Sequence, residues 1–294
     1  MSLTRKQATS VPVLMYHHVT PSGGSLSCSV KNFESQMRFL AKHGYTSLRG
    51  EQFAAFLEGK AVPKRSVLLT FDDGYLNNYQ YAHPILQRYG MHAMLFLITQ
   101  YIHDGPRRPT MLNGADQAYS PGHYECKKLI AEGRANEVML RWEEVRAMQA
   151  ADSFEFHSHT HTHNRWDLAA DNANKNRHIR EDLLQSQHEF QTHLGAVSDH
   201  LCWPQGYFDK DYVAIAKALG FNYLYTTDAY GMNQAHGAAD HIYRIAVRNR
   251  PGLWLGQRLW LASHPRLGPL YNQAKLKKKQ RREQKRLARQ GEAS

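Results

Sequence analysis

The chain of 294 residues has few cysteines and no long apolar run. Its three cysteines, Cys28, Cys126 and Cys202, lie far apart without a Cys-x-x-Cys pair, which argues against a disulfide framework and a cysteine zinc cluster. No segment reaches the roughly 18 apolar residues that a membrane-spanning helix needs. The first residues are partly basic and carry no apolar run of signal-peptide length. We therefore expect a protein of the reducing cytoplasm.

Acidic residues are too few to balance the basic ones, and the excess of positive charge is local. The formal net charge is +11, and residues 273–294 alone hold nine Lys or Arg against two acidic residues, a balance of +7. The rest of the chain therefore carries only +4, so the basic character belongs to one end. We predict a domain over residues 11–265 and a basic, low-complexity tail over 266–294, which forms a solvated helix.

Apolar runs and helical periodicity alternate along the predicted domain. Alternation of this kind predicts a parallel α/β architecture that is closed, or nearly closed, into a barrel. Such barrels place their chemistry on loops at the carboxyl ends of the strands. Residues 103–125 lack periodicity and are predicted to be a long loop. The clearest predicted strands are 11–19, 66–71 and 91–98, and the clearest helices are 32–42, 79–89, 141–150, 171–194 and 211–219.

Two short segments stand out as sites of chemistry. Asp72 and Asp73 follow the apolar run SVLLTF, where the carboxylates of neighbouring residues diverge and can serve different roles. The stretch FEFHSHTHTHN, residues 154–164, places a histidine at four alternate positions, 157, 159, 161 and 163. Neutral imidazole is the commonest protein ligand of zinc, and a catalytic zinc site needs three protein ligands. Spacing alone leaves two histidine pairs open, 157 with 161 or 159 with 163.

Two further segments complete the pattern: YHH at 16–18 and CWPQGYFD at 202–209. Taken in this order, the four segments resemble the polysaccharide deacetylases, the NodB-type carbohydrate esterases. TFDDG (70–74) matches the first motif of that family, and SHTHTH (158–163) matches its second, usually Ser-His-Thr-x-Ser-His. The opening VLMYHHV and the later WPQG resemble the circularly permuted branch that contains the poly-N-acetylglucosamine deacetylases. The resemblance covers most of residues 11–250.

The resemblance implies a distorted (β/α) barrel of the NodB type and an assignment of roles. Asp73, His159 and His163 would hold Zn²⁺ or another divalent transition metal. Asp72 would be the general base, and His17 the general acid that protonates the departing amine. The backbone N–H of Gln205 would stabilise the oxyanion. The implied reaction is hydrolysis of the acetamido group of an N-acetylhexosamine, with release of acetate.

The sequence departs from the family pattern at three positions. Residue 205 is Gln where the family usually has Tyr, residue 157 is His where it usually has Gly, and residue 202 is Cys where many members carry an Arg that orients the base. Arg244, in YRIAVRN, is the candidate replacement for that Arg. Two alternatives remain open: another metal-dependent amidohydrolase or nuclease on an α/β barrel, and a nucleic-acid-binding protein that uses the basic tail.

The catalytic region and the basic tail each indicate an expected partner of the chain. The catalytic region implies an N-acetylated saccharide or glycolipid as substrate. The tail carries Lys and Arg without interleaved aromatic residues, so it lacks stacking platforms for nucleic-acid bases, and we do not expect specific nucleic-acid binding. Each basic residue near an anionic membrane contributes about 1 kcal/mol of binding free energy. We therefore expect a cytoplasmic protein that can lie on the inner membrane face and act on a lipid-linked precursor.

Overall fold

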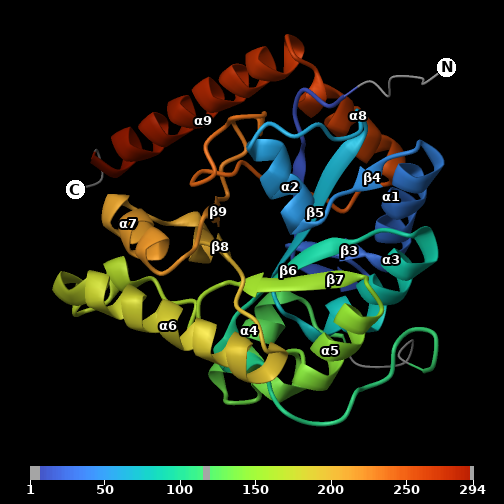
Figure 1. The fold of residues 1–294 in the computed structure, drawn as a ribbon. Coiled ribbons are helices and arrows are strands. Elements are labelled where there is room, and N and C mark those ends of the chain that lie inside the picture. The colour runs from blue at the N-terminus through green and yellow to red at the C-terminus, as the bar shows by residue number, and fades with distance from the viewer. Residues whose placement is uncertain (1–6, 115–119, 292–294) are drawn as a thin grey trace.

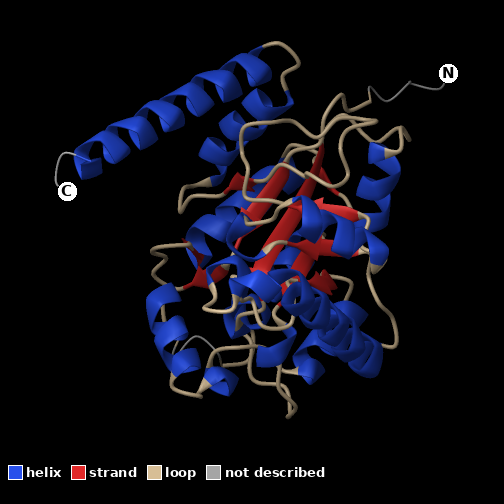
Figure 2. Cartoon of the chain, turned by 90° about the vertical axis from the view of Figure 1, so that its left-hand side faces the viewer, coloured by secondary structure: helices blue, strands red, loops and turns tan. Residues whose placement is uncertain are grey.

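A parallel sheet curled into a distorted barrel forms the centre of the molecule. The computed structural model describes residues 7–114 and 120–291. The main sheet runs in the order β10-β1-β5-β6-β7-β8-β9, with β4 paired to β5 beside it. Helices surround this sheet (Figures 1 and 2). The predicted α/β barrel fold is confirmed.

The elements have the following bounds. The strands are β1 Val13–Tyr16, β2 His18–Thr20, β3 Ser27–Ser29, β4 Thr46–Ser47, β5 Ser66–Asp73, β6 Ala93–Leu97, β7 Phe154–Ser158, β8 His200–Cys202, β9 Tyr223–Tyr225 and β10 Ile245–Ala246. The helices are α1 Val30–Lys42, α2 Gly50–Leu57, α3 His83–Tyr89, α4 His123–Ala131, α5 Trp142–Ala150, α6 Lys175–Leu194, α7 Lys210–Ala218, α8 Gly252–Ser263 and α9 Leu267–Gly291.

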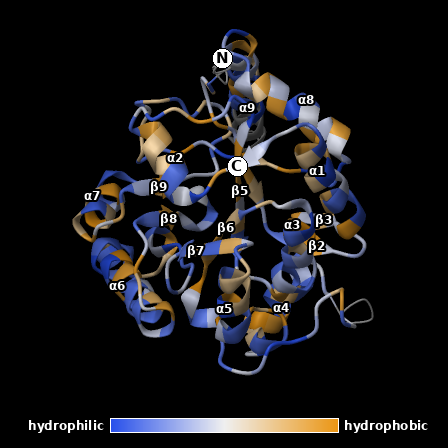
Figure 3. Ribbon diagram, turned by 45° about the vertical axis from the view of Figure 1, so that its right-hand side comes forward, coloured by the Kyte–Doolittle hydropathy of each residue, from blue (hydrophilic) through white to orange (hydrophobic). Residues whose placement is uncertain are grey.

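The central strands have continuous apolar sequences because they are buried on both faces. Every residue of β5 and β6 is buried, because helices cover one face of these strands and the barrel interior covers the other. The covering helices are amphipathic: in α1, Phe33, Met37 and Leu40 are buried at helical spacing, and the Ser29 side chain caps the first turn by accepting from Asn32 N–H. Figure 3 shows the complementary pattern, with hydrophilic residues along the outside of helices such as α6.

The two ends of the sheet meet through one bridge. Tyr225 in β9 pairs in parallel with Ile242, a residue of the segment that leads into β10. β10 in turn pairs with β1 through Leu14 and Ile245. The barrel is therefore distorted and closed only narrowly at this seam. All neighbouring strands of the main sheet are parallel, so their carboxyl ends gather at one rim.

Three local features differ from the sequence-based expectations. The strand predicted over residues 11–19 is interrupted at His17, so that β1 ends at Tyr16 and β2 begins at His18. The segment predicted to be a loop over 103–125 ends in α4, which begins at His123. The helix predicted over 79–89 starts as a π-helical turn, Asn78–Ala82, before α3. Each difference lies at the rim where the strands end.

Candidate active site

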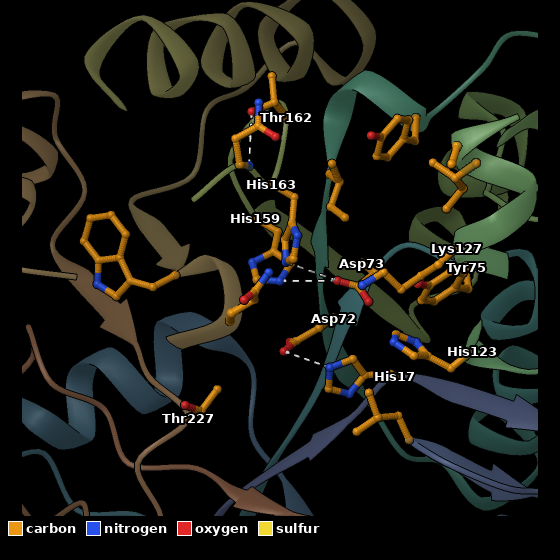
Figure 4. A pocket seen from close by; sticks show the side chains of 18 residues that line it. His17, Asp72, Asp73, Tyr75, His123, Lys127, His159, Thr162, His163 and Thr227 are labelled. Carbon is orange, nitrogen blue, oxygen red and sulfur yellow. Dashed lines mark hydrogen bonds and ion pairs between the residues drawn. The ribbon is translucent and has the colours of Figure 1, made fainter. Parts of the chain in front are cut away.

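The carboxyl end of β5 carries two buried carboxylates in different directions. Asp72 and Asp73 are 3% and 6% exposed, so both are shielded from bulk water. Asp73 has a φ of 76°, in the left-handed region that non-glycine residues rarely adopt. This backbone twist ends the strand and separates the two side chains. Asp73 faces the histidines that follow β7, whereas Asp72 faces His17 (Figure 4). Asp72 also pairs with Arg244.

Asp73 meets two of the four alternate histidines. Its Oδ1 lies 3.4 Å from Nε2 of His159 and 3.8 Å from Nε2 of His163. The three ligand atoms lie within 4.8 Å of one another. Of the two histidine pairs that spacing left open, the structure thus places 159 and 163 beside Asp73.

The other pair lies elsewhere. His157 is on β7 and points toward the barrel interior, where its Nδ1 lies 2.6 Å from Ser198 Oγ and its ring 4.8 Å from that of His200. His161 lies beside Thr99, with 3.0 Å between Nδ1 and Oγ1. Neither contacts Asp73.

The loop that carries the two histidines is tightly anchored. Thr160 and His163 both have positive φ, 65° and 60°, and such strained conformations persist only where surrounding contacts fix them. Asp182 of α6 supplies the contacts: it accepts the N–H groups of His161 and Thr162, at 2.9 and 2.8 Å, together with the Thr162 hydroxyl. Asp182 was not among the residues singled out from the sequence, because an acidic residue in a polar helix carries no distinguishing signal.

Asp72 is held by a fully buried arginine. Arg244 donates from Nη1 to Asp72 Oδ1 at 2.7 Å and from Nη2 to Oδ2 at 2.8 Å, a bidentate pair. Its Nε donates to the carbonyl of Thr226, and its Nη2 lies 3.0 Å from Cys202 Sγ. The short cysteine side chain leaves room for a guanidinium that arrives from the start of β10. Arg244, the candidate replacement named from the sequence, thus contacts both Asp72 and residue 202.

The remaining two candidate residues face the same cavity. His17, at the break between β1 and β2, has its Nε2 3.9 Å from Asp72 Oδ2. Gln205, with a φ of 54°, lies in the turn Pro204–Gly206 that follows β8. Both line a cavity of about 520 Å³ together with Asp72, Asp73, His159 and His163. The structure therefore brings six of the seven candidate site residues to the lining of one cavity, and Arg244 pairs with Asp72.

The electrostatics of the site favour ionised carboxylates. Burial alone raises the pKa of Asp72, but the guanidinium of Arg244 and the nearby histidines outweigh burial and hold the pKa below its usual value. Burial also raises the pKa of Asp73, but the hydrogen bond with His159 and the nearby imidazoles of His17 and His163 outweigh burial and bring the pKa well below its usual range. Both groups are therefore anions at neutral pH.

The donor set fits a divalent metal. His159 Nδ1 lies 2.8 Å from the carbonyl oxygen of Cys202, which accepts the Nδ1 proton and leaves Nε2 as the ring atom that would bind a metal. Burial alone lowers the pKa of His159, but Cys202 and Asp73 outweigh burial and raise it, so metal binding at Nε2 would displace a proton. Burial and the proximity of His159 lower the pKa of His163 to about 4, so its ring is neutral and able to ligate. Ligand atoms bonded to a tetrahedral zinc lie roughly 3.4 Å apart, close to the distances from Asp73 to the two histidines. Among the described residues, one other group, Asp72, His159 and Cys202, meets the same proximity criterion, but Arg244 already occupies its carboxylate.

Helix α4 is a part of the site that sequence reasoning missed. It contributes His123, Lys127, Ile130 and Ala131 to the lining of the cavity. His123 lies beside His18, with 3.3 Å between its Nδ1 and His18 Nε2. The only available signal was the spacing of 123, 127 and 130, which places these residues on one helical face.

The comparisons with known proteins agree on one family. A family model for polysaccharide deacetylase matches residues 59–224, more than half of the chain. The poly-beta-1,6-N-acetyl-D-glucosamine N-deacetylase of Escherichia coli (strain K12) is 24% identical over 239 residues, which are 78% of this chain and 34% of that protein. YxkH of Bacillus subtilis (strain 168) is 43% identical over 100 residues, 34% of this chain and 35% of that protein. The matched regions thus span about a third of the length of these relatives.

Solved structures share the fold. IcaB from Ammonifex degensii has a TM-score of 0.66 at 22% identity, covering 86% of this chain and 97% of that one. The Streptococcus pyogenes deacetylase PplD, solved in complex with acetate, has a TM-score of 0.67 at 21% identity, covering 88% of this chain and 100% of that one. At these identities the likeness shows the fold alone.

Proposed function

Since the chain belongs to the polysaccharide deacetylase family, we propose that it is a metal-dependent N-deacetylase of an N-acetylhexosamine in a saccharide or lipid-linked glycan. One observation carries the proposal: the Asp73–His159–His163 cluster lies beside an ionised Asp72 in one cavity, with His17 within reach of Asp72. The name of the Escherichia coli relative, which specifies an N-acetylglucosamine polymer, supports the substrate class.

Each residue of the site has a role in this reaction. Asp73, His159 and His163 would hold Zn²⁺ or another divalent transition metal, which when bound lowers the pKa of a water and polarises the acetamide carbonyl. Asp72 accepts the proton of the attacking water, and Arg244 keeps Asp72 ionised and oriented for that task. The backbone N–H of Gln205 donates to the developing oxyanion. His17 protonates the departing amine, because an unprotonated amine is a poor leaving group.

Acetate release from chitin oligosaccharides by the zinc-loaded protein tests this function. We expect acetate from the wild type, and loss of more than about 100-fold on treatment with a chelator or in Asp73→Asn. Asp152→Asn is the matched control, since Asp152 also has a positive φ but lies on the surface, and it should retain activity. Absence of acetate release from every N-acetylated sugar tested, with zinc bound, would contradict the proposal.

We also propose that the basic C-terminal segment contacts an anionic membrane surface, so that the enzyme works on a lipid-linked glycan at the cytoplasmic face. Support comes from α9, which lies on the outside of the molecule (Figure 1) and exposes Lys277, Lys278, Arg281 and Arg282. Exposed Leu267 and Leu270 on the same helix add apolar surface. Among the described residues, no helix combines the length and hydropathy that crossing a bilayer requires.

A further inference from the structure

The wall of the cavity formed by α4 presents hydrogen-bond donors. His123 and Lys127 lie four residues apart on this helix, both line the cavity, and Figure 4 shows them on the side of Asp73 and Tyr75. None of the roles in deacetylation proposed above uses either side chain.

Hydrogen bonds behind His123 fix the position of its proton. Val19 N–H donates to Asn77 Oδ1 at 3.3 Å, so the amide nitrogen of Asn77 must point the other way, where it donates to Nδ1 of His18 at 2.9 Å. His18 then accepts at Nδ1 and carries its proton on Nε2, which donates to His123 Nδ1 at 3.3 Å. His123 therefore accepts at Nδ1 and carries its own proton on Nε2.

The environment of this chain keeps both rings neutral. His18 is fully buried and stacks on Tyr75 with 3.8 Å between ring centroids. Burial lowers the pKa of His18 to about 3, and burial also lowers the pKa of His123. A neutral His123 with its Nδ1 occupied offers the cavity a single group, the Nε2–H donor. The hydrogen-bonded chain from Asn77 through His18 to His123, called the relay below, thus selects one of the two neutral tautomers of His123.

Lys127 adds a cation one turn further along α4. Within residues 7–114 and 120–291, no carboxylate lies within ion-pair distance of Lys127, whereas its neighbour Lys128 pairs with Glu132 at 3.8 Å. Lys127 and neutral His123 can donate but leave no acceptor facing the cavity. A substrate group that meets both must therefore supply acceptor oxygens, and a negatively charged group fits best.

We infer that His123 and Lys127 form a subsite for an anionic oxygen group, a carboxylate or a phosphate, carried by the substrate beside the reacting N-acetylated sugar. His18 and Asn77 act as positioning residues that hold the His123 donor. The inference rests on the proposed function, because it names the class of saccharide that the same cavity accepts: an acidic glycan or a sugar phosphate.

Calorimetric binding to the zinc-loaded protein tests the subsite without requiring turnover. The probes are chitin tetrasaccharide, which is neutral, hyaluronan tetrasaccharide, which carries carboxylates, and N-acetylglucosamine 1-phosphate. We expect the wild type to bind at least one acidic probe about tenfold more tightly than the neutral one. Lys127→Met should remove this preference by weakening the binding of the acidic probe about tenfold. Lys128→Met, the adjacent control outside the cavity, should leave the preference intact.

The outcomes separate the subsite from the reaction. Equal affinity for neutral and acidic probes, or a preference that survives Lys127→Met, overturns the subsite even if acetate is released. Lys127-dependent binding of an acidic probe without acetate release would instead count against the deacetylase activity while supporting the subsite. Phosphate can also bind zinc directly. Tighter binding of N-acetylglucosamine 1-phosphate that persists in Lys127→Met would therefore be assigned to the metal and would overturn the inference.

The positioning role of His18 and Asn77 has its own readout. Nitrogen-15 NMR of histidine-labelled protein distinguishes the two neutral tautomers, and His123→Gln identifies the His123 signals by their loss. We expect the Nε2–H tautomer in the wild type. In Asn77→Asp, the carboxylate accepts from His18 Nδ1–H, so the relay reverses and His123 should carry its proton on Nδ1. The Nδ1–H tautomer in the wild type would overturn the relay whether or not the variant folds.

Discussion

Two adjacent carboxylates perform separate tasks because their backbone forces their side chains apart. In a regular strand, successive side chains already point to opposite faces. The positive φ of Asp73 ends the strand at that residue and directs its carboxylate toward the histidine loop, while Asp72 stays in the barrel wall beside Arg244. The cost of a left-handed aspartate, about 1–3 kcal/mol, is offset by the contacts of the site.

Replacement of Arg244 by leucine should destabilise the fold in a pH-dependent way. Asp72 has a folded-state pKa below its usual value, so it contributes stability above its unfolded pKa, about 3.9, and this contribution is lost as the pH falls through the folded pKa. Arg244→Leu leaves a buried carboxylate unpaired, which costs about 3–5 kcal/mol at pH 7 and less near pH 4. Urea unfolding at the two pH values measures the difference.

Exposed Arg248 provides the control for that measurement. Arg248→Leu makes the same chemical change a few residues away and should alter stability by less than about 0.5 kcal/mol. A loss in Arg244→Leu that is the same at pH 7 and pH 4 would show that packing, not the charge pair, holds Arg244 in place.

Alanine variants of the two histidine pairs should differ in their zinc content. His159→Ala removes a side chain 3.4 Å from Asp73 and should abolish stoichiometric zinc. His157→Ala removes a ring that contacts Ser198 and His200 instead, and should retain one zinc per chain. Elemental analysis of both purified variants provides the measurement. If His157→Ala loses its zinc and His159→Ala keeps it, the metal site belongs to the pair 157 and 161.

At the scale of elements, apolar runs located the strands and their polar ends located the site. SVLLTF predicts β5 because a strand buried on both faces must be apolar throughout, and Asp72 and Asp73 follow at its carboxyl end. Elements that owe their structure to tertiary contacts escaped prediction. β10 has two residues, too few to show periodicity. α4 follows a segment rich in Pro and Gly, and its amphipathic face is short.

The loop between β7 and α6 should depend on one helix residue. Asp182→Ala removes the acceptor for two backbone N–H groups of the loop, so His159 and His163 lose their fixed geometry. We expect zinc affinity to fall about 10–100-fold, as is typical when support for metal ligands is removed. Glu181→Ala, at a position that is 57% exposed, is the matched control. Competition with a chromogenic chelator gives both affinities, and equal values would contradict this role.

For the whole molecule, the parallel sheet explains how residues distant in sequence converge. The ends of β1, β5, β7 and β8 meet at one rim, which brings His17, Asp72, His159 and Gln205 to a single cavity. α9 remains outside this arrangement. It contacts the body through Asn272, which donates to the Gly231 carbonyl, and through Lys275, which lies over the Tyr230 ring. Its basic side is left to solvent.

Neutralising the exposed basic residues of α9 should weaken binding to anionic vesicles. Substitution of Lys277, Lys278, Arg281 and Arg282 by Gln removes four positive charges, each contributing about 1 kcal/mol near such a surface. The binding constant for phosphatidylserine-containing vesicles, measured by cosedimentation, should fall by about 100-fold or more. A control that converts four other exposed lysines, 31, 42, 60 and 64, to Gln makes the same change in net charge. Equal losses in both variants would indicate a general charge effect.

The origin of Arg244 also sets the order in which the active site is completed during synthesis. Arg244 and Asp72 are 172 positions apart, and the arginine immediately precedes β10, the last strand of the sheet in the chain. A nascent chain that has emerged through β9 already contains the histidine loop and both carboxylates, but Asp72 still lacks its counter-ion. Burial of that carboxylate is unfavourable until residue 244 arrives. The last strand to be made therefore completes the barrel wall and the charge balance of the site in the same step.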